Sequence, residues 1–483
     1  MLEGLNPKEV LGYFEKICSI PHGSGNTDTL ADYFLDFAKE NGLDAKKDNV
    51  GNIIIYKDAT VGYEDHETVI LQGHMDMVCD KIAECTLDME QDGLELETDG
   101  KFVWAKGTTL GGDDGIALAY ILAVLASKEL SHPKIEALFT TDEETDMGGA
   151  SGLETEYLNG RKLINIDSEE EGVLTVSCAG GVGVFCEMPV RFISTDNMNT
   201  RQSSFRISVE DLLGGHSGGE IHKPRQNAIL LLAVMLNAIK AECDFTIAHF
   251  QGGVKDNAIP KSAEVIVCVD EENEEIFEEL AIACAEGITM ELEDTEPELS
   301  MVIEGILPVL SCMDKESTQK VLGFLTEVPN GVATMSQNID GLVQTSSNLG
   351  IARTENENFS TTFLIRSSVT DEKEIMKNII QTCSEKYGGK TEFDAEYPAW
   401  EYAEDSPLRE KMTEVYEKMY EKQPIIEAVH AGLECGFFAE KIPGIDMVSF
   451  GPNLFDVHTP AERLEVVSVE RCWEYLVKLL SSL

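Results

Sequence analysis

The sequence predicts an α/β domain, with a largely parallel central sheet and helices on both of its faces, that is interrupted by an inserted α+β domain. The first observation is that residues 1–186 alternate short apolar runs with longer helical patterns, among them NIIIY, TVILQGHMD, GIALAYILAVLASKEL and KIEALFTTDEE. Such alternation is typical of a parallel sheet covered by helices. The second is that from about Phe192 longer strand segments such as SSFRISVED and STTFLIRSSV appear, separated by amphipathic helices. The first pattern returns near EYPAW, which predicts a first domain of residues 1–186 and 400–483 around an insertion of residues 187–399.

Composition limits the classes of partner. The 483-residue chain carries 37 Lys and Arg against 88 Asp and Glu, a formal net charge of -51. A field of this sign repels nucleic-acid phosphates and anionic lipid headgroups, so neither nucleic acid nor a membrane is expected as a partner. The N-terminus lacks the basic and apolar regions of a signal peptide, and no run of about 18 uncharged apolar residues occurs. The 12 cysteines are scattered and form no C-x-x-C pair, which favours reduced cysteines in a cytoplasmic protein.

Chemically reactive side chains follow the predicted strands of the first domain. The apolar run TVILQ is followed by His74 and Asp76, and IEALFTTD by Glu143 and Glu144. KLINI is followed by Asp167 in the same way, and DMVSFGP leads through a short loop to His458. In open α/β sheets ligands bind outside the carboxyl ends of the strands, so these residues are expected to meet there.

A further acidic pair opens a predicted helix. The segment TLGGDDGIALAY places Asp113 and Asp114 at the helix N-terminus, where the helix dipole and unpaired amide groups favour a carboxylate. Histidine nitrogens and carboxylate oxygens together form the ligand set of zinc, manganese or cobalt. Because residues i and i+2 of a strand share a face, Asp76 is expected to accept a hydrogen bond from the ring of His74 and so orient it as a metal ligand. Either Asp113 or Asp114 could reach a metal from this position.

Seven ordered motifs resemble one protein family. They are GHMDMV, GGDDGIALA, TTDEETDMGGASGL, NIDSEEEG, GGHSGGEIHKPRQNA, HAGLECGFF and HTPAERL. In order and over the whole chain they resemble the aminoacyl-histidine dipeptidases, also called Xaa-His or β-alanyl-histidine dipeptidases. These belong to the co-catalytic zinc metallopeptidase group that includes aminoacylase and glutamate carboxypeptidase. The resemblance implies hydrolysis of small unblocked dipeptides, with Xaa-His substrates preferred.

The resemblance also implies a site with two divalent ions, zinc first and manganese or cobalt as alternatives. His74 would bind one ion and His458 the other, while Asp113 would bridge both. Glu144 and Asp167 would each complete the ligands of one ion.

The same resemblance assigns the catalytic roles. Glu143 would be the general base, taking a proton from the metal-bridging water and passing it to the leaving amine, and Asp76 would keep its orienting role. A glutamate bound to metal would be a poor base. If the strand is still extended at Glu143 and Glu144, their side chains point different ways, so one can bind metal while its neighbour stays free for proton transfer.

The insertion would be the lid of this family, closing over the metal site. Within it, His216 would steady the oxyanion and Arg366 would clamp a substrate carboxylate, assisted by Asn257. Outside it, Glu434 of HAGLECGFF is expected to hold the free amino group of a dipeptide. A small peptide is thus the expected partner, and a homodimer is one possible assembly.

Other readings remain open at this point. A related tripeptidase, a broader dipeptidase or an N-acyl amino acid deacylase would use the same site. The segment GGHSGG also matches G-x-S-x-G between a predicted strand and helix, which would make Ser217 the nucleophile of a serine esterase. A cysteine hydrolase with Cys435 and His430, and a non-catalytic binding protein, are further alternatives. The esterase leaves His74 and Asp167 without a role, and a non-catalytic protein would not need every ligand position filled.

Overall fold

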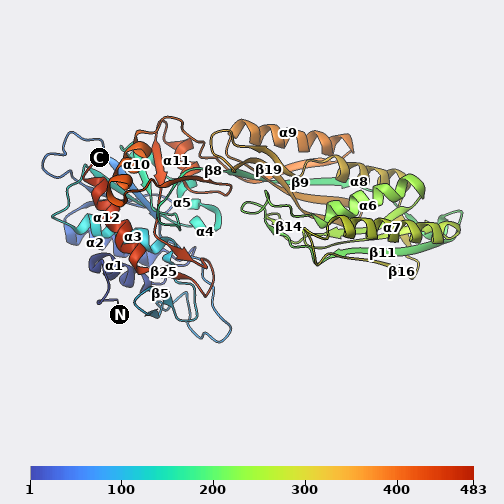
Figure 1. The fold of residues 1–483 in the computed structure, drawn as a ribbon, viewed down its shortest axis with the longest axis horizontal. Helices are drawn as coiled ribbons and strands as arrows, with labels where there is room; N and C mark the ends of the chain where they lie inside the picture. Colours follow the sequence, from blue (N-terminus) through green and yellow to red (C-terminus); the bar gives the residue numbers. More distant parts are fainter. Residues whose placement is uncertain (1) are drawn as a thin grey trace. The chain divides into compact units, whose positions relative to one another are not determined.

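The computed structural model describes residues 2–483 and divides the chain into two compact units (Figure 1). Unit 1 comprises Met1–Cys178, Trp400–Ala428 and Leu433–Leu483, and unit 2 comprises Ala179–Ala399 and Val429–Gly432. The structure therefore groups 179–186 and 429–432 with unit 2, although the sequence suggested that they belong to the α/β domain.

Unit 1 is built on a mixed sheet with a parallel centre. Within residues 2–483 its strand order is β1-β2-β6-β3-β7-β23-β8-β22. The strands are β1 (Asp44–Lys47), β2 (Ile53–Lys57), β3 (Val69–His74), β6 (Ile135–Thr140), β7 (Lys162–Asn165), β8 (Val173–Cys178), β22 (Ile425–Val429) and β23 (Asp446–Ser449). β3 runs parallel to β6 and β7, and β7 parallel to β23, so the carboxyl ends of four strands meet at one edge. On either side of this parallel centre the pairing is antiparallel, between β1 and β2, β2 and β6, and β8 and β23.

Helices cover both faces of this sheet. Every residue of β3, β6 and β8 is buried, as expected of strands packed on both sides. The helices of unit 1 are α1 (Lys8–Cys18), α2 (Asp28–Asn41), α3 (Gly112–Ala126), α4 (Glu143–Asp146), α5 (Gly148–Gly152), α10 (Pro407–Tyr420), α11 (Cys435–Lys441), α12 (Val466–Leu480) and the 3-10 turn η1 (Thr155–Tyr157). α3 is apolar on all sides and almost wholly buried, which is typical of a central helix.

A small second sheet lies in unit 1, with strand order β24-β25-β5-β4. Its strands are β4 (Leu96–Thr98), β5 (Phe102–Ala105), β24 (Leu454–Phe455) and β25 (Arg463–Glu465). The loop between β24 and β25 carries His458, so this sheet fixes both ends of that loop.

Unit 2 is an α+β unit around a long antiparallel sheet of order β16-β11-β15-β13-β19-β20-β9-β21, with β18 added beside β19. These strands are β9 (Gly180–Pro189), β11 (Gln202–Glu210), β13 (Thr246–Gly252), β15 (Ala263–Asp270), β16 (Ser300–Ile306), β18 (Gly331–Met335), β19 (Val343–Glu355), β20 (Asn358–Ser367) and β21 (Lys390–Tyr397). Two short pairs join β10 (Phe192–Ser194) to β17 (Ser311–Met313) and β12 (Gly215–His216) to β14 (Ala258–Ile259).

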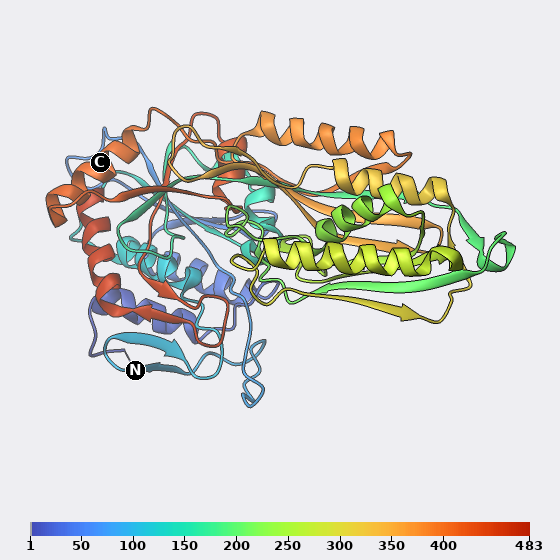
Figure 2. The same cartoon turned by 45° about the vertical axis from the view of Figure 1, so that its right-hand side comes forward.

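The long helices of unit 2 lie along one face of its sheet, as Figures 1 and 2 show. They are α6 (Ala228–Glu242), α7 (Glu274–Glu291), α8 (Lys315–Glu327) and α9 (Thr370–Lys386), with the 3-10 turns η2 (Thr195–Asn197) and η3 (Glu271–Asn273). Their apolar sides form a single core with the sheet, including Phe205, Phe277, Phe324 and Phe363. The predicted fold class is thus confirmed. Among residues 2–483, none of the helices combines the length and apolar character needed to span a bilayer.

Candidate active site

His74 is the last residue of β3, at the carboxyl edge of the parallel strands of unit 1. Its side chain is 1% exposed, and its Nδ1 donates to the backbone carbonyl of Asp76 at 2.9 Å. That contact leaves Nε2 as the nitrogen available for a metal ion. The preceding residue must be glycine, because a Cβ at Gly73 would lie 2.6 Å from Oδ2 of Asp114.

Asp113 lies between the two histidines. Its Oδ1 is 2.9 Å from Nε2 of His74, and its Oδ2 is 3.2 Å from Nε2 of His458. The two oxygens of one carboxylate therefore face two different imidazoles, which is the arrangement a bridging ligand needs.

Each histidine also faces a second carboxylate. Oδ1 of Asp167, which follows β7, lies 3.5 Å from Nε2 of His74. Oε1 of Glu144 lies 2.8 Å from Nε2 of His458. The structure thus brings together two overlapping sets of nitrogen and oxygen atoms that share Asp113.

The electrostatics of this cluster indicate a place for cations. The carboxylates of Asp113 and Glu144 accept hydrogen bonds from His458 and raise its pKa to about 11. Burial alone would lower the pKa of His74, but the hydrogen bonds to Asp113 and Asp167 raise it well above its usual value. The carboxylates make the surroundings of both imidazoles strongly negative. A divalent cation at each imidazole would balance that charge, and the nitrogen and oxygen atoms present are the ligands that zinc favours.

Asp113 and Asp114 differ in what they contact. Oδ2 of Asp114 accepts a hydrogen bond from the backbone amide of His74 at 3.2 Å, and the residue is 2% exposed. Burial raises the pKa of Asp114 well above its usual range. Although His74, Asp114 and Asp167 also form a compact group, only Asp113 faces both histidines. The geometry therefore favours Asp113 over Asp114 as the bridge.

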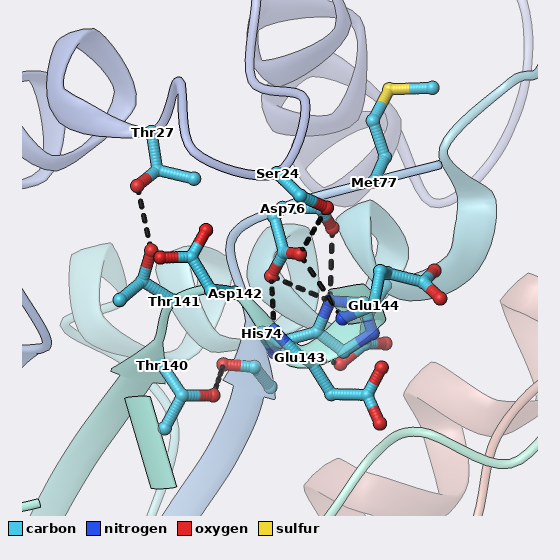
Figure 3. Close-up of polar contacts among 12 residues, drawn as sticks. Ser24, Thr27, His74, Asp76, Met77, Thr140, Thr141, Asp142, Glu143 and Glu144 are labelled. Atoms are coloured by element: carbon cyan, nitrogen blue, oxygen red, sulfur yellow. Dashed lines mark hydrogen bonds and ion pairs between the residues drawn. The ribbon is translucent and has the colours of Figure 1, made fainter. Parts of the chain in front are cut away.

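Asp76 contacts the ring of His74 through its backbone carbonyl and not, as expected, through its carboxylate. Its carboxylate Oδ1 lies 3.6 Å from Nδ1 of His74, which is too long for a hydrogen bond, and the backbone carbonyl of Asp76 accepts instead. The carboxylate accepts from the backbone amides of Glu143 at 2.9 Å and Glu144 at 3.2 Å, and from the Ser24 hydroxyl at 2.8 Å (Figure 3). Asp76 thus fixes the turn that carries both glutamates.

The strand does not extend as far as Glu143 and Glu144, so the condition under which their side chains would alternate along a strand is not met. β6 ends at Thr140, Asp142 takes a left-handed conformation with φ 56°, and the one-turn helix α4 begins at Glu143. Successive helical residues are rotated by about 100°, so the two side chains still diverge, as Figure 3 shows.

Glu143 has the properties of a proton acceptor near a metal site. Within the described residues its carboxylate has no hydrogen-bond partner, whereas Glu144 contacts His458. Burial raises the pKa of Glu143 well above its usual value, and the negative charge of Asp167 adds to the effect while His74 opposes it. A carboxylate in this environment binds a proton more readily than one in water.

Glu434 lies in a buried polar group of unit 1. It is fully buried, and its Oε2 accepts from the Gln72 amide at 2.6 Å and the Thr140 hydroxyl at 2.7 Å. Burial raises its pKa to about 8. Its Oε1 has no hydrogen-bond partner among residues 2–483.

Two supporting residues, Glu462 and Ser24, were not identified from the sequence. Glu462 is 2% exposed, and its carboxylate accepts from the backbone amides of Leu110 at 2.8 Å, Gly111 at 3.2 Å and Gly112 at 2.8 Å. It therefore ties the loop before Asp113 to the segment that carries His458. The sequence feature that could have identified Glu462 is its position four residues after His458 in HTPAERL. Nothing in the sequence indicates that the partners of Glu462 are backbone amides.

In unit 2 the structure brings His216 and Asn257 together. The short strands β12 and β14 pair His216 with Ala258, and the amide of Ser217 donates to the carbonyl of Asn257 at 2.9 Å. Nδ1 of His216 accepts from the backbone amides of Gly218 and Gly219 at 3.2 and 3.3 Å. The ring proton of His216 must then be on Nε2, which leaves an N–H donor for a ligand.

Arg366 also belongs to unit 2, near His216, whose pKa is lowered by burial and by the positive charge of Arg366. Arg366 is 7% exposed, and its Nη1 donates to the Tyr397 hydroxyl at 2.9 Å. Among residues 2–483 its Nε has no hydrogen-bond partner, which is unusual for a buried guanidinium.

The alternative nucleophiles lack the necessary surroundings. Ser217 is 1% exposed, its hydroxyl has no partner in the described part of the chain, and the next helix begins only at Ala228. This is no strand-turn-helix nucleophile elbow. Cys435 is fully buried and burial raises its pKa, while His430 is hydrogen-bonded to Ser346 at 2.7 Å. A buried thiol of this kind is unreactive.

Comparison with known proteins identifies the family of this chain. Residues 70–482 match the model of peptidase family M20/M25/M40. The cytosol non-specific dipeptidase of Escherichia coli (strain K12) is 36% identical over 482 residues, covering 100% of this chain and 99% of its own. The crystal structure of the aminoacylhistidine dipeptidase from Vibrio alginolyticus has a TM-score of 0.94 at 37% identity and covers 100% of this chain and 98% of its own. A Staphylococcus aureus tripeptidase shares the fold, with a TM-score of 0.55 at 16% identity over 99% of this chain and 98% of its own. The chain belongs to peptidase family M20/M25/M40.

Proposed function

We propose that this protein is a two-metal dipeptidase that hydrolyses small unblocked dipeptides, with Xaa-His peptides including β-alanyl-histidine as its preferred substrates. The observation that carries the proposal is Asp113, whose two oxygens face His74 and His458 separately. The two relatives that align over the whole chain at 36% and 37% identity are named as a non-specific dipeptidase and an aminoacylhistidine dipeptidase, which supports the substrate class.

We assign one ion to His74, Asp113 and Asp167, and the other to His458, Asp113 and Glu144. Zinc is proposed first because two imidazoles and three carboxylates suit it, and manganese or cobalt would accept the same ligands. Two such ions, when bound, would polarise the scissile carbonyl and lower the pKa of the attacking water.

The protein's own groups then move the proton. The carboxylate of Glu143 has no hydrogen-bond partner within residues 2–483. It accepts a proton from the attacking water and delivers this proton to the nitrogen of the leaving amine. Asp76 holds the backbone amides of Glu143 and Glu144, so one carboxylate stays available for proton transfer while its neighbour binds metal.

We propose that four further residues bind the substrate. His216 offers its Nε2–H to the developing oxyanion, since backbone amides occupy its Nδ1. Arg366 binds the terminal carboxylate of the substrate through its guanidinium group. Asn257, which lies beside His216, assists in binding the same substrate. Glu434, with its unpartnered Oε1, holds the free amino group. If Glu434→Gln left KM for dipeptides unchanged, this last role would be wrong.

The cellular setting is part of the proposal. A cytoplasmic location is supported by the name of the Escherichia coli relative and by the scattered free cysteines. Small peptides are the proposed partners, and a homodimer is the assembly to test by light scattering of the purified protein.

The test is hydrolysis of a peptide panel by the purified protein, with and without chelator and with metal added back. The panel contains β-alanyl-histidine, Ala-His, Ala-Ala, a tripeptide and an N-acetyl amino acid. Chelator-reversible cleavage confined to unblocked dipeptides, and fastest for those ending in histidine, is expected. Cleavage of the tripeptide or the acylated substrate instead would keep the metal site and change the substrate class. Activity that ignores the chelator would refute the two-metal reading.

A further inference from the structure

A row of paired residues crosses four neighbouring strands of the unit 2 sheet. Ser346 on β19 pairs with Arg366 on β20, Arg366 pairs with Gly181 on β9, and Gly181 pairs with Tyr397 on β21. Directly paired residues of neighbouring strands project their side chains from the same face. The four positions therefore form one line, with Arg366 inside it.

The glycine in this row makes room for the tyrosine. A Cβ at Gly181 would lie 2.3 Å from both Cζ and Oη of Tyr397, so the ring occupies the space of the missing side chain. By crossing that position, the phenol reaches the next strand and accepts a hydrogen bond from Nη1 of Arg366 at 2.9 Å.

A bulge in the backbone of β21 orients the ring of Tyr397. The register between β21 and β9 shifts between Asp394 and Tyr397, and Ala395 between them has a φ of 48°. A bulge of this kind redirects a side chain. Lys373 of α9, only 3% exposed, holds the bulge by donating to the carbonyl of Tyr397 at 3.0 Å and pairing with Glu396 at 3.0 Å.

The other end of the row carries no negative charge. Ser346 is hydrogen-bonded to Nε2 of His430 at 2.7 Å, and burial together with the charge of Arg366 lowers the pKa of His430 to about 3. His430 is thus neutral, and Nε of Arg366 has no partner within residues 2–483. A buried cation without a counter-ion is costly, so its charge is available for an anion from outside.

We propose that Tyr397 is a positioning residue, which holds the guanidinium of Arg366 across the Gly181 gap so that its other N–H groups bind the terminal carboxylate of the substrate. This inference rests on the proposed dipeptidase function and adds to it the residues that select a free C-terminus. Tyr397 itself need not contact the substrate.

The test compares two substrates, alanyl-histidine and its C-terminal amide, which lacks the carboxylate. Tyr397→Phe keeps the ring and removes only the hydroxyl, so KM for alanyl-histidine is expected to rise about tenfold with kcat little changed. KM for the amide should stay within twofold of wild type. An equal change for both substrates, or a change in neither, would overturn the inference.

Two glycine variants provide a matched pair. Gly181→Ala forces the ring of Tyr397 away and is expected to reproduce the effect of Tyr397→Phe on the dipeptide alone. Gly183→Ala lies two residues along the same strand, where a Cβ would meet only the carbonyl group of Asp394, with its oxygen at 3.3 Å and its carbon at 3.9 Å, and should behave as wild type. Equal effects of the two glycine variants would contradict the inference. A wild-type protein that cleaves neither substrate would instead refute the proposed function itself, and the inference with it.

Discussion

Glu462→Gln is expected to weaken metal binding without removing a metal ligand. The carboxylate accepts three backbone N–H groups, two at Oε2 and one at Oε1, from the loop that ends at Asp113. An amide side chain has a single acceptor oxygen, so it cannot accept at both positions, and its NH₂ group would face an N–H donor. Losing one hydrogen bond to a charged acceptor costs about 1.5–3 kcal/mol.

This cost should appear in metal affinity, because in the proposed metal site the loop holds Asp113 between His74 and His458. A free energy of about 1.5–3 kcal/mol corresponds to an affinity that is about 10- to 150-fold lower. Measured losses on removing partners that orient metal ligands are of similar size, about 10- to 100-fold.

The assay is competition for Zn²⁺ between the protein and a chelating dye at pH 7, with thermal unfolding of the metal-free proteins as a check on folding. Glu474→Gln is the matched control, since it removes the same charge from an exposed position on α12. An affinity of Glu462→Gln within twofold of wild type would refute the reasoning. So would an equal loss in Glu474→Gln, which would trace the effect to net charge.

Three further outcomes are expected. Glu143→Gln should lower kcat by about 10²- to 10⁴-fold while Zn²⁺ affinity stays the same, and a parallel loss of affinity would place Glu143 among the ligands. His430 has a pKa lowered to about 3 by burial and by Arg366, so below about pH 6.5 the unfolded chain binds a proton that the folded one excludes. Stability should therefore fall as the pH drops from 6.5 toward 3, by up to about 1.4 kcal/mol per pH unit. In urea unfolding at pH 5, 6 and 7, the free energy of unfolding should fall less steeply with decreasing pH for His430→Gln than for wild type. An identical dependence on pH in the two proteins would contradict this prediction. Ser217→Ala should retain chelator-sensitive hydrolysis within twofold, whereas complete loss would revive the serine nucleophile.

The sequence was most informative where a side chain's position depends on the strand before it. His74 and Asp167 follow buried apolar runs, and parallel strands end at one edge, so the rule for open α/β sheets was enough to predict that they meet. The change of pattern near Phe192 likewise predicted a second α+β unit. No knowledge of loop conformation was needed for either inference.

Contacts that depend on loop backbones could not be predicted in this way. Glu143 begins a helical turn rather than continuing a strand because Asp142 takes a left-handed conformation, which no residue type requires. Asp76 and Glu462 act on backbone amides, and every residue except proline has one, so no pairing of residue types in the sequence identifies these partners. The orientation of His74 by a carbonyl rather than a carboxylate has the same cause.

The two glycines beside functional groups show how much a single sequence can say about such contacts. Glycine at a buried position of a strand indicates that something approaches the backbone closely, and both Gly73 and Gly181 occupy such positions. At Gly73 the approaching group is Asp114, and at Gly181 it is the ring of Tyr397. The sequence therefore marks the position of each close approach, but only the structure identifies the residue that makes it. Because each of these residues hydrogen-bonds a candidate site residue, Asp114 at His74 and Tyr397 at Arg366, substitution of either glycine by alanine should act through that residue and not only through stability.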